Sequence, residues 1–380
     1  MPRSYRFRAS LGVALSLYVL VVLDTAALAR SLRVSADSGK LQLAVAMSLE
    51  GDTLRLAPGL YCEEPSPTDL GPTMLVLDRP LVIIGEGGGE GEGEAVLHGG
   101  LTARILLIEP EAAGTVIRNV ALHGGLAWAG GAVYQRSALL QLVNCSLREN
   151  VAQTDGGALY AEQGNLVLEG CVFDGNRAGE RGGGIFLTNG AAQLSGCTLI
   201  GDDAAAGGAL YLGPGGQGQL NSCLVVDGSA VRGGWACVED GFLSARQSTF
   251  FGLPGEPESG GIVLRGALGS AFIETSILCF AGAPALAGLR DGAAMLVCCN
   301  VFGNRGGDWT GMVAAQAEQG GNLSANPAFC GLHRGNFGLD PRSPCAPANN
   351  PCGELIGALD VGCTDCEPED ASAARSARED

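Results

Sequence analysis

The chain has 380 residues, of which 61 are glycine and only 5% are aromatic. This balance disfavours a fold of packed helices and favours repetitive β structure. The formal charge is −17, and Lys40 is the single lysine of the sequence. Because nucleic-acid binding needs a basic stripe that neutralises phosphates, nucleic acid is not an expected partner.

The N-terminus has the three regions of a cleavable export signal. Residues 1–10 contain three arginines, residues 11–23 form an apolar run, and small residues follow at 27–29. An uncleaved anchor is the alternative, but the run is shorter than the roughly 20 residues that span a bilayer. We expect residues 1–29 to be a signal peptide and the mature chain to begin at Arg30, without a membrane span. The protein is then exported to the periplasm, the cell surface or the extracellular space.

Two sequence signatures recur with the same period. The first is Gly-Gly-Ala-aliphatic-Tyr, whose aromatic position falls at Tyr134, Tyr160, Phe186 and Tyr211. The second is a cysteine column with steps of 26 residues, formed by Cys145, Cys171, Cys197 and Cys223 and continued with small slips by Ser248, Ser276 and Asn300. Two independent columns with one period indicate a solenoid.

Each repeat contains short β-type segments separated by glycine, asparagine and aspartate turns. Consecutive coils are expected to stack as parallel strands about 4.8 Å apart. Three positions stay apolar from coil to coil and predict three inward-facing columns, that is, a triangular cross-section with three sheets. These columns are Val116, Leu142, Leu168, Leu194 and Leu220; Leu147, Phe173, Leu199, Val225 and Phe250; and Val133, Leu159, Ile185 and Leu210.

The cysteine column also faces inward if strand alternation holds. Stacked strands hold neighbouring Cβ atoms side by side, a geometry that disfavours disulfides. We expect buried free thiols there, with metal binding or redox chemistry as the alternative. The glycine pairs, such as Gly156-Gly157, are expected at tight corners that leave no room for a Cβ and that use positive φ.

Two of the repeats resemble a known bacterial class. Leu147-x-x-Asn150 followed by Gly156-Gly157-Ala158-Leu159-Tyr160, and Phe173-x-x-Asn176 followed by Gly182-Gly183-Gly184-Ile185-Phe186, resemble the paired motifs of chlamydial polymorphic outer membrane proteins and other bacterial β-helix repeat proteins. The segment 41–61 resembles the first coil of secreted pectate-lyase-like proteins, in which a short helix closes the open end. The resemblance implies an all-β, right-handed parallel β-helix over residues 30–330, with an N-terminal helical cap. Such a fold hosts many functions and does not fix one.

Cysteines cluster after the last expected coil. The cysteine-rich segment 331–366 resembles the closing segment of β-helix repeat proteins, and residues 367–380 read as a disordered acidic tail. No strand ladder fixes side-chain directions in the closing segment, so disulfides are expected there. The candidates are Cys330, Cys345, Cys352, Cys363 and Cys366. Cys298 and Cys299 point to opposite faces of a regular strand and are not expected to pair with each other.

One group of candidate functional residues is acidic. Asp202 and Asp203 lie at one turn, with Asp227 about one rung on, and the three are candidates for catalysis or Ca²⁺ binding. Their alternative role is turn capping, because Asn150 and Asn176 share the turn position of Asp202 and would stack with it through side-chain hydrogen bonds. Apart from Ca²⁺ at these aspartates, we expect no cofactor and no metal site.

The second group consists of Tyr134, Tyr160, Phe186 and Tyr211. Strand alternation turns these rings outward, and an exposed aromatic stripe suits stacking on sugar rings or on a protein partner. Their alternative role is a ladder of rings that stack on each other in a corner. The leading hypothesis is a non-enzymatic, exported β-helix that serves surface attachment or binds an extracellular glycan or surface protein. The alternative is a polysaccharide lyase or glycoside hydrolase that acts on acidic polysaccharide.

Overall fold

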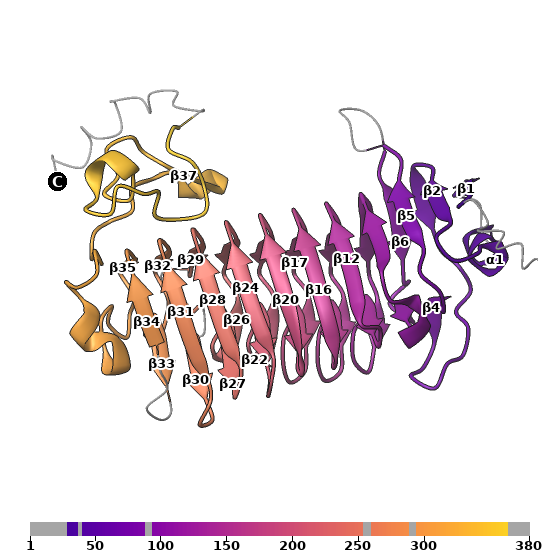
Figure 1. Ribbon diagram of the computed structural model, residues 1–380, viewed down its shortest axis with the longest axis horizontal. Helices are drawn as coiled ribbons and strands as arrows, with labels where there is room; N and C mark the ends of the chain where they lie inside the picture. The colour runs from indigo at the N-terminus through magenta and orange to yellow at the C-terminus, as the bar shows by residue number, and fades with distance from the viewer. Residues whose placement is uncertain (1–28, 37–39, 88–92, 254–259, 289–293, 364–380) are drawn as a thin grey trace, which may run out of the picture.

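A computed structural model of the chain describes residues 29–36, 40–87, 93–253, 260–288 and 294–363. In this part the chain forms a parallel β-solenoid whose coils stack along the long axis, from the indigo end to the orange end of Figure 1. Partner strands in successive coils are offset by about 26 residues, as between Leu159 and Ile185. The predicted parallel β-helix is therefore confirmed. The expected tail and all but the last residue of the expected signal peptide lie outside the described residues.

One face of the solenoid is sheet A, in which all neighbouring strands pair in parallel (Figure 1). In spatial order its strands are β1 (Ser31–Val34), β2 (Thr53–Leu56), β5 (Val82–Gly85), β8 (Thr115–Arg118), β12 (Leu139–Val143), β16 (Gly164–Glu169), β20 (Gly190–Ser195), β24 (Gln217–Asn221), β28 (Phe242–Arg246), β31 (Ser270–Glu274) and β34 (Ala294–Val297).

Sheets B and C form the other two main faces. Sheet B contains β3 (Gly59–Tyr61), β6 (Ala95–His98), β9 (Val120–His123), β13 (Ser146–Arg148), β17 (Val172–Asp174), β21 (Thr198–Ile200), β25 (Leu224–Val226), β29 (Thr249–Phe251), β32 (Ile277–Cys279) and β35 (Asn300–Phe302). Sheet C contains β4 (Thr73–Leu77), β7 (Arg104–Ile108), β11 (Val133–Gln135), β15 (Leu159–Ala161), β19 (Ile185–Leu187), β23 (Leu210–Leu212), β27 (Ala236–Glu239), β30 (Ile262–Arg265) and β33 (Leu286–Gly288).

The register of these sheets creates the inward columns of one continuous core. The predicted columns of sheets B and C are in register and buried. In sheet A the assignment of Val116 was wrong, because Leu142 pairs with Ile117 and Val116 pairs with Gln141. The step from Ile117 to Leu142 is one residue shorter than the next step, from Leu142 to Leu168, so Ile117 takes the buried position.

The cysteine column faces the core, and its thiols are free. Its members are at most 1% exposed: Cys145, Cys171, Cys197 and Cys223. Each Sγ donates to a main-chain carbonyl oxygen, at distances of 3.4, 3.4, 3.3 and 3.5 Å respectively. The column continues to Cys299 and not, as predicted, to Asn300. Asn300 pairs with Ile277, so Cys299 stacks on Ser276.

A small fourth sheet, which the sequence did not predict, lies between sheets B and C in each coil that contains it. Sheet D consists of β10 (Leu126–Ala127), β14 (Val151–Ala152), β18 (Arg177–Ala178), β22 (Asp203–Ala206) and β26 (Ser229–Arg232). The glycine pair of the repeat signature packs against the backbone of sheet D. A Cβ on Gly157 would lie 2.2 Å from the carbonyl oxygen of Gly183 and 2.6 Å from the carbonyl carbon of Arg177, and Gly156 has a φ of +64°. Both physical reasons for glycine therefore apply at this corner.

Short helices close both ends of the core. Leu41 and Val45 of α1 (Lys40–Met47) are buried in the core cluster, which confirms the expected N-terminal cap. Val313 of η2 (Gly311–Gln316) is buried in the same cluster at the other end. η1 (Pro110–Ala112) connects sheets C and A. Among the described helices, none has the length and hydrophobicity of a membrane span.

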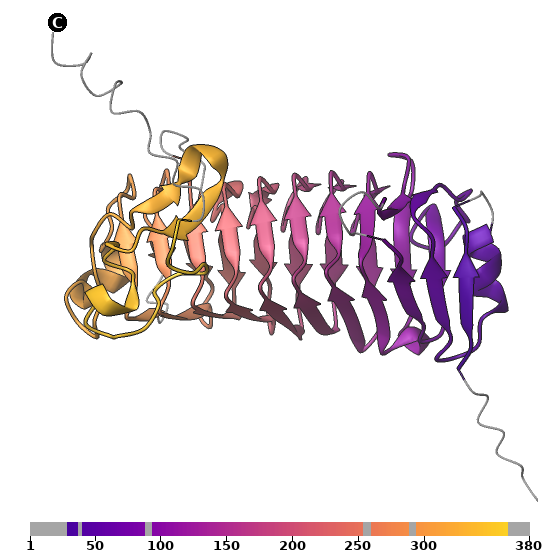
Figure 2. The same ribbon diagram turned by 90° about the horizontal axis from the view of Figure 1, so that it is seen from above.

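The C-terminal segment folds back over the outer side of sheet B (Figures 1 and 2). It contains the antiparallel strands β36 (Phe329–Gly331) and β37 (Asn336–Leu339), and the turns η3 (Leu332–Arg334) and η4 (Pro347–Asn349). The ring of Phe337 lies 5.1 Å from that of Phe251 in sheet B. This contact buries an outer aromatic of the solenoid.

Among the described residues, one disulfide lies within this segment and a second joins it to the solenoid. Cys330 bonds to Cys363, and Cys352 bonds to Cys298, which the sequence had not suggested as a disulfide candidate. Cys345, a predicted candidate, is instead a buried free thiol. Its Sγ accepts a hydrogen bond of 3.1 Å from Asn300 Nδ2, within the apolar cluster that docks the segment. The remaining candidate, Cys366, lies outside the described residues.

Candidate functional site

The signature aromatics form a stack on the outer side of sheet C, one ring per coil. Ring centroids are 4.6 Å apart between Tyr134 and Tyr160, 4.8 Å between Tyr160 and Phe186, and 5.3 Å between Phe186 and Tyr211. Phe186 and Tyr211 are only 4% and 1% exposed, whereas Tyr134 and Tyr160 are partly exposed. Of the expected exposed stripe, only Tyr134 and Tyr160 are accessible to solvent. Phe186 and Tyr211 instead fit the alternative of a buried ladder of stacked rings.

Arg181 covers the buried half of the stack. Its guanidinium carbon lies 5.0 Å from the Phe186 ring centroid and 5.5 Å from that of Tyr211, within cation–π range. Asp155 holds the guanidinium by two hydrogen bonds of 2.8 Å, from Nε to Oδ1 and from Nη2 to Oδ2. These bonds raise the pKa of Arg181. Arg181, held in place by Asp155, therefore covers the rings of Phe186 and Tyr211.

Tyr134 and Tyr160 line an open pocket of about 310 Å³ together with Trp128. The other lining residues are Asp69, Leu70, Arg104, Ala129, Thr154 and Asp155. The Trp128 side chain is 65% exposed, although its backbone is anchored, because the Trp128 carbonyl accepts hydrogen bonds of 2.9 Å from both N and Oγ1 of Thr154. The pocket thus has an exposed indole and two tyrosine rings on fixed backbone.

Each aspartate of the pocket is held by an arginine. Asp155 is bound by Arg181, as described above, and Asp69 Oδ2 accepts a hydrogen bond of 2.7 Å from Arg136 Nη2. This bond lowers the pKa of Asp69, which is therefore ionised at neutral pH. Arg136 also lies 3.4 Å from a carboxylate oxygen of Glu109. The two arginines therefore hold the carboxylates of Asp69 and Asp155 in fixed orientations, as hydrogen-bond acceptors.

Arg104 forms the floor of the pocket. It is 1% exposed and donates to three main-chain carbonyls, those of Gly130 at 3.2 Å, Ala129 at 3.0 Å and Leu70 at 3.2 Å. Its guanidinium carbon lies 5.1 Å from the Tyr134 ring centroid. Burial lowers the pKa of Arg104 to about 10, so the group is charged at neutral pH. These bonds connect the loop that contains Leu70 to the loop that contains Ala129 and Gly130.

Asp202 is a buried member of a turn ladder. It is 1% exposed, and its Oδ1 accepts hydrogen bonds of 2.9 Å from both N and Nδ2 of Asn176. Its Oδ2 has no hydrogen-bond partner among the described residues. Burial raises the pKa of Asp202 to about 8. The turn-capping alternative therefore describes this residue, which is closed to a substrate.

The other two candidate aspartates lie in different local environments. Asp203, the next residue along a strand, points outward and forms an exposed ion pair of 3.3 Å with Arg177. Asp227 has a left-handed φ of 52° and donates its main-chain N–H to the Phe251 carbonyl at 2.8 Å. Asp202 is thus buried, whereas the Asp203 side chain is exposed to solvent. Across the described residues, no group of three or more His, Cys, Asp or Glu could hold a metal ion, and no cofactor is indicated.

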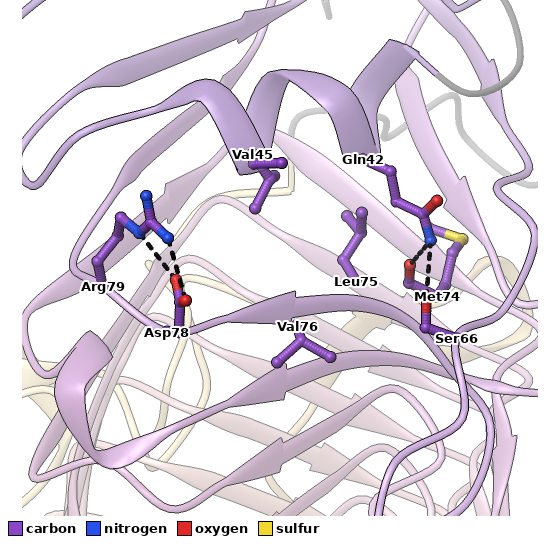
Figure 3. Close-up of a pocket in the computed structure, with 9 residues that line it drawn as sticks. Gln42, Val45, Ser66, Met74, Leu75, Val76, Asp78 and Arg79 are labelled. Atoms are coloured by element: carbon purple, nitrogen blue, oxygen red, sulfur yellow. Dashed lines mark hydrogen bonds and ion pairs between the residues drawn. The ribbon is translucent and has the colours of Figure 1, made fainter.

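A larger pocket, of about 410 Å³, lies beneath α1 at the N-terminal cap (Figure 3). Gln42 Nε2 donates to the Met74 carbonyl at 3.0 Å at one end, and Arg79 pairs with Asp78 at 2.8 Å at the other. Arg79 Nη1 also donates to the Ser48 carbonyl at 2.6 Å. Apolar side chains lie between the two ends: Val45, Leu75 and Val76. These contacts tie the cap to the first coils, so we assign this pocket a structural role.

Sequence reasoning named two members of the aromatic pocket as candidate binding residues and did not identify its other aromatic residue, Trp128. Tyr134 and Tyr160 belong to the repeat signature, whereas Trp128, Asp69 and Arg104 do not recur with its period. One sequence feature could have identified Trp128. It lies two residues before Gly130-Gly131, a glycine pair that the repeat predicts at a tight corner. Nothing in the sequence places the loop at Asp69 beside it.

Comparison with known proteins agrees with the fold. The family described as the Chlamydia polymorphic membrane protein (Chlamydia_PMP) repeat matches residues 170–188, which include the Phe173-x-x-Asn176 motif and the Gly182-Gly183 pair. No curated protein matches the chain. The family match and the parallel solenoid together show a β-helix repeat protein with repeats like those of polymorphic membrane proteins.

Proposed function

We propose that this chain is an exported β-helix protein of the surface-attachment type, which binds carbohydrate at the pocket of Trp128, Tyr134 and Tyr160 without cleaving it. The observation that carries the proposal is the exposed Trp128 indole beside two stacked tyrosine rings. Rigid aromatic faces bury a large apolar area when they stack on the C–H face of a sugar ring. Because the Trp128 indole is exposed, the packing of the solenoid core does not explain its presence in this pocket.

Polar groups at the same pocket complement the hydroxyls of a sugar. The carboxylates of Asp69 and Asp155 accept hydrogen bonds, and hydrogen bonds to charged groups contribute roughly 1.5–3 kcal/mol in proteins. Arg136 and Arg181 already hold these carboxylates. Little side-chain entropy is therefore lost when a ligand binds.

The size of the pocket favours a glycan over a protein surface. Its volume of about 310 Å³ lies at the lower end of the range for small-ligand sites. Such a volume suits one or two sugar rings. Stable protein–protein interfaces instead bury about 1,200–2,000 Å² in total and are much flatter.

Three features support export. The N-terminus has the pattern of a cleavable signal, and the matched family is named for membrane proteins. The chain also contains the disulfides Cys298–Cys352 and Cys330–Cys363, and disulfides persist mainly in oxidising compartments.

A glycan array followed by calorimetry with the best-bound oligosaccharide tests the binding proposal. We expect Trp128→Ala to weaken binding by about 10-fold or more, since aromatic anchors commonly contribute over 1 kcal/mol. Phe242→Ala is the matched control, because Phe242 is an exposed aromatic (38%) on sheet A, away from the pocket. Binding that is unchanged in Trp128→Ala, or absent for every glycan, would contradict the proposal.

Incubation of the same oligosaccharides with the protein, with and without Ca²⁺, tests the alternative of a polysaccharide lyase or hydrolase. New reducing ends or unsaturated products in the wild type would replace the binding-only proposal with an enzymatic one. We expect the oligosaccharides to be recovered intact.

A further inference from the structure

Asp52, the residue before β2, accepts a group of hydrogen bonds beside the start of β1. It is 1% exposed, and its Oδ1 accepts a hydrogen bond of 2.7 Å from the main-chain nitrogen of Arg30. Its Oδ2 accepts bonds from Nη2 and Nε of Arg30, at 2.6 and 3.1 Å, and from Leu49 N at 2.8 Å. One buried carboxylate therefore binds both the backbone and the side chain of one residue.

Arg30 is also the point at which regular pairing begins. Thr53 N donates to the Arg30 carbonyl at 2.8 Å, and the β1–β2 ladder starts with Ser31 opposite Thr53. The preceding residue, Ala29, is exposed. The described contacts thus hold the chain from the nitrogen atom of Arg30 onward.

We propose that Asp52 is the receptor for a new N-terminus, which a signal peptidase creates by hydrolysing the Ala29–Arg30 bond. Water adds across this amide bond, Ala29 leaves with the new carboxylate, and Arg30 keeps the nitrogen as an α-ammonium group. The small residues at Ala27 and Ala29 suit such a cleavage. The inference rests on the export part of the proposed function and is independent of carbohydrate binding.

The two Asp52 oxygens bind different groups of Arg30, and this arrangement suits the conversion of its main-chain nitrogen to an ammonium group. Oδ2 takes the guanidinium of Arg30, which also donates to the Met47 carbonyl at 3.0 Å, and Oδ1 takes the main-chain nitrogen. Cleavage turns this nitrogen from an amide into a cation at the same place. Hydrogen bonds between a cation and a carboxylate are roughly twice as strong as neutral ones.

The expected consequence is a tighter first coil. Strand β1 is the edge of sheet A, and chain termini are where strands open first. A charged N-terminus bound to Asp52 holds this edge strand against β2. Removal of the signal peptide would then strengthen the contact between Arg30 and Asp52 that holds the N-terminal end of the solenoid.

Two forms of the mature chain test the receptor role: residues 30–380 with a free amine, and the same residues acetylated on the Arg30 nitrogen. Acetylation keeps the N–H donor and every residue but removes the charge. We expect the free-amine form to melt a few degrees higher at neutral pH. Equal melting temperatures would overturn the receptor role, whatever the protein binds.

Asp52→Asn provides the matched variant. In this background we expect the free-amine and acetylated forms to melt together, whereas in Asp78→Asn, which alters an exposed ion pair at the same end, the difference should persist. If Asp52→Asn does not fold, the wild-type pair alone decides. Mass spectrometry of the chain exported from cells that express residues 1–380 should find Arg30 as the first residue, and any other N-terminus would overturn the cleavage site.

Discussion

Asn176 donates two hydrogen bonds of 2.9 Å to Oδ1 of Asp202, one from its main-chain nitrogen and one from Nδ2. Asn150 donates to Oδ1 of Asn176 in the same way, at 3.1 and 3.0 Å. Because Asp202 uses Oδ1 as the asparagines do, its Oδ2 corresponds to their amide nitrogen. In Asn176 that nitrogen also donates to the Leu147 carbonyl at 3.0 Å. An ionised carboxylate lacks the proton that this position requires.

We therefore expect Asp202→Asn to stabilise the protein at neutral pH. The pKa of Asp202 is about 8 in the folded chain, and that of an unfolded aspartate is about 3.9. Folding thus favours the protonated form, so the contribution of Asp202 to stability is most favourable below about pH 4 and falls as pH rises toward about 8. The variant has no such loss, and its gain in unfolding free energy at pH 7 should be about 1–3 kcal/mol.

Melting curves between pH 4 and pH 8 measure this difference. The gain from Asp202→Asn should shrink as the pH falls toward 4. Asn176→Asp is the inverse control at the neighbouring rung and should lower the melting temperature at pH 7. A wild type that is more stable than Asp202→Asn at pH 7 would contradict the ladder argument.

Gly157→Ala should strongly destabilise the solenoid. The added Cβ would lie 2.2 Å from the Gly183 carbonyl oxygen and 2.6 Å from the Arg177 carbonyl carbon, both of which belong to the backbone. We expect a loss of about 3 kcal/mol or more, measured by chemical denaturation. Gly331→Ala is the control, because its Cβ would have its nearest neighbour at 3.8 Å. Similar stability of the two variants would show that the corner can relax.

Cys145, Cys171, Cys197 and Cys223 should resist alkylation in the folded protein. Their side chains are at most 1% exposed, whereas Cys62 is an exposed free thiol. The thiolate is the reactive form, and burial disfavours it, as at Cys299, whose pKa it raises to about 12. Peptide mass spectrometry after iodoacetamide treatment should find Cys62 labelled before unfolding and the column labelled only after it. Labelling of the column in native protein would indicate that coils open locally.

Cys352→Ser should loosen the closing segment. The Cys298–Cys352 bond closes a loop of 54 residues, and the loss of such a bond typically costs about 2–4 kcal/mol. Thermal melting under non-reducing conditions should therefore show a lower transition, and Cys62→Ser, which removes an exposed free thiol, should leave it unchanged. Peptide mapping that finds Cys298 or Cys352 bonded to another cysteine would refute the observed pairing.

The repeat period allowed the stacking of coils, the three main sheets and the buried cysteines to be predicted. These properties depend on alternation within short strands, which is local. Where a coil changes length, the prediction slipped by one residue, as between Val116 and Ile117 and between Asn300 and Cys299. Sheet D was missed because its strands have only two to four residues and its recurring buried side chains are small alanines: Ala152, Ala178, Ala204 and Ala230.

The candidate site was only half predictable. The sequence marked Tyr134 and Tyr160 but could not rank them above Phe186 and Tyr211, since all four share one position in the repeat. Exposure of a ring depends on what folds over it, and Arg181 covers the latter two. The sequence likewise could not show that Asp202 is buried, because its burial depends on neighbouring coils.

The sequence by itself determined the coil of this protein, because a period of about 26 residues and the alternation of inward side chains repeat from rung to rung. Only the tertiary structure decided where a ligand has access. Asp69, Arg104 and Trp128 lie outside the repeat signature and meet at the pocket through the folding of loops between coils. The repeat predicts which strand residues face the core, but the exposure of a residue on the outer surface depends on segments far apart in the chain that fold over it.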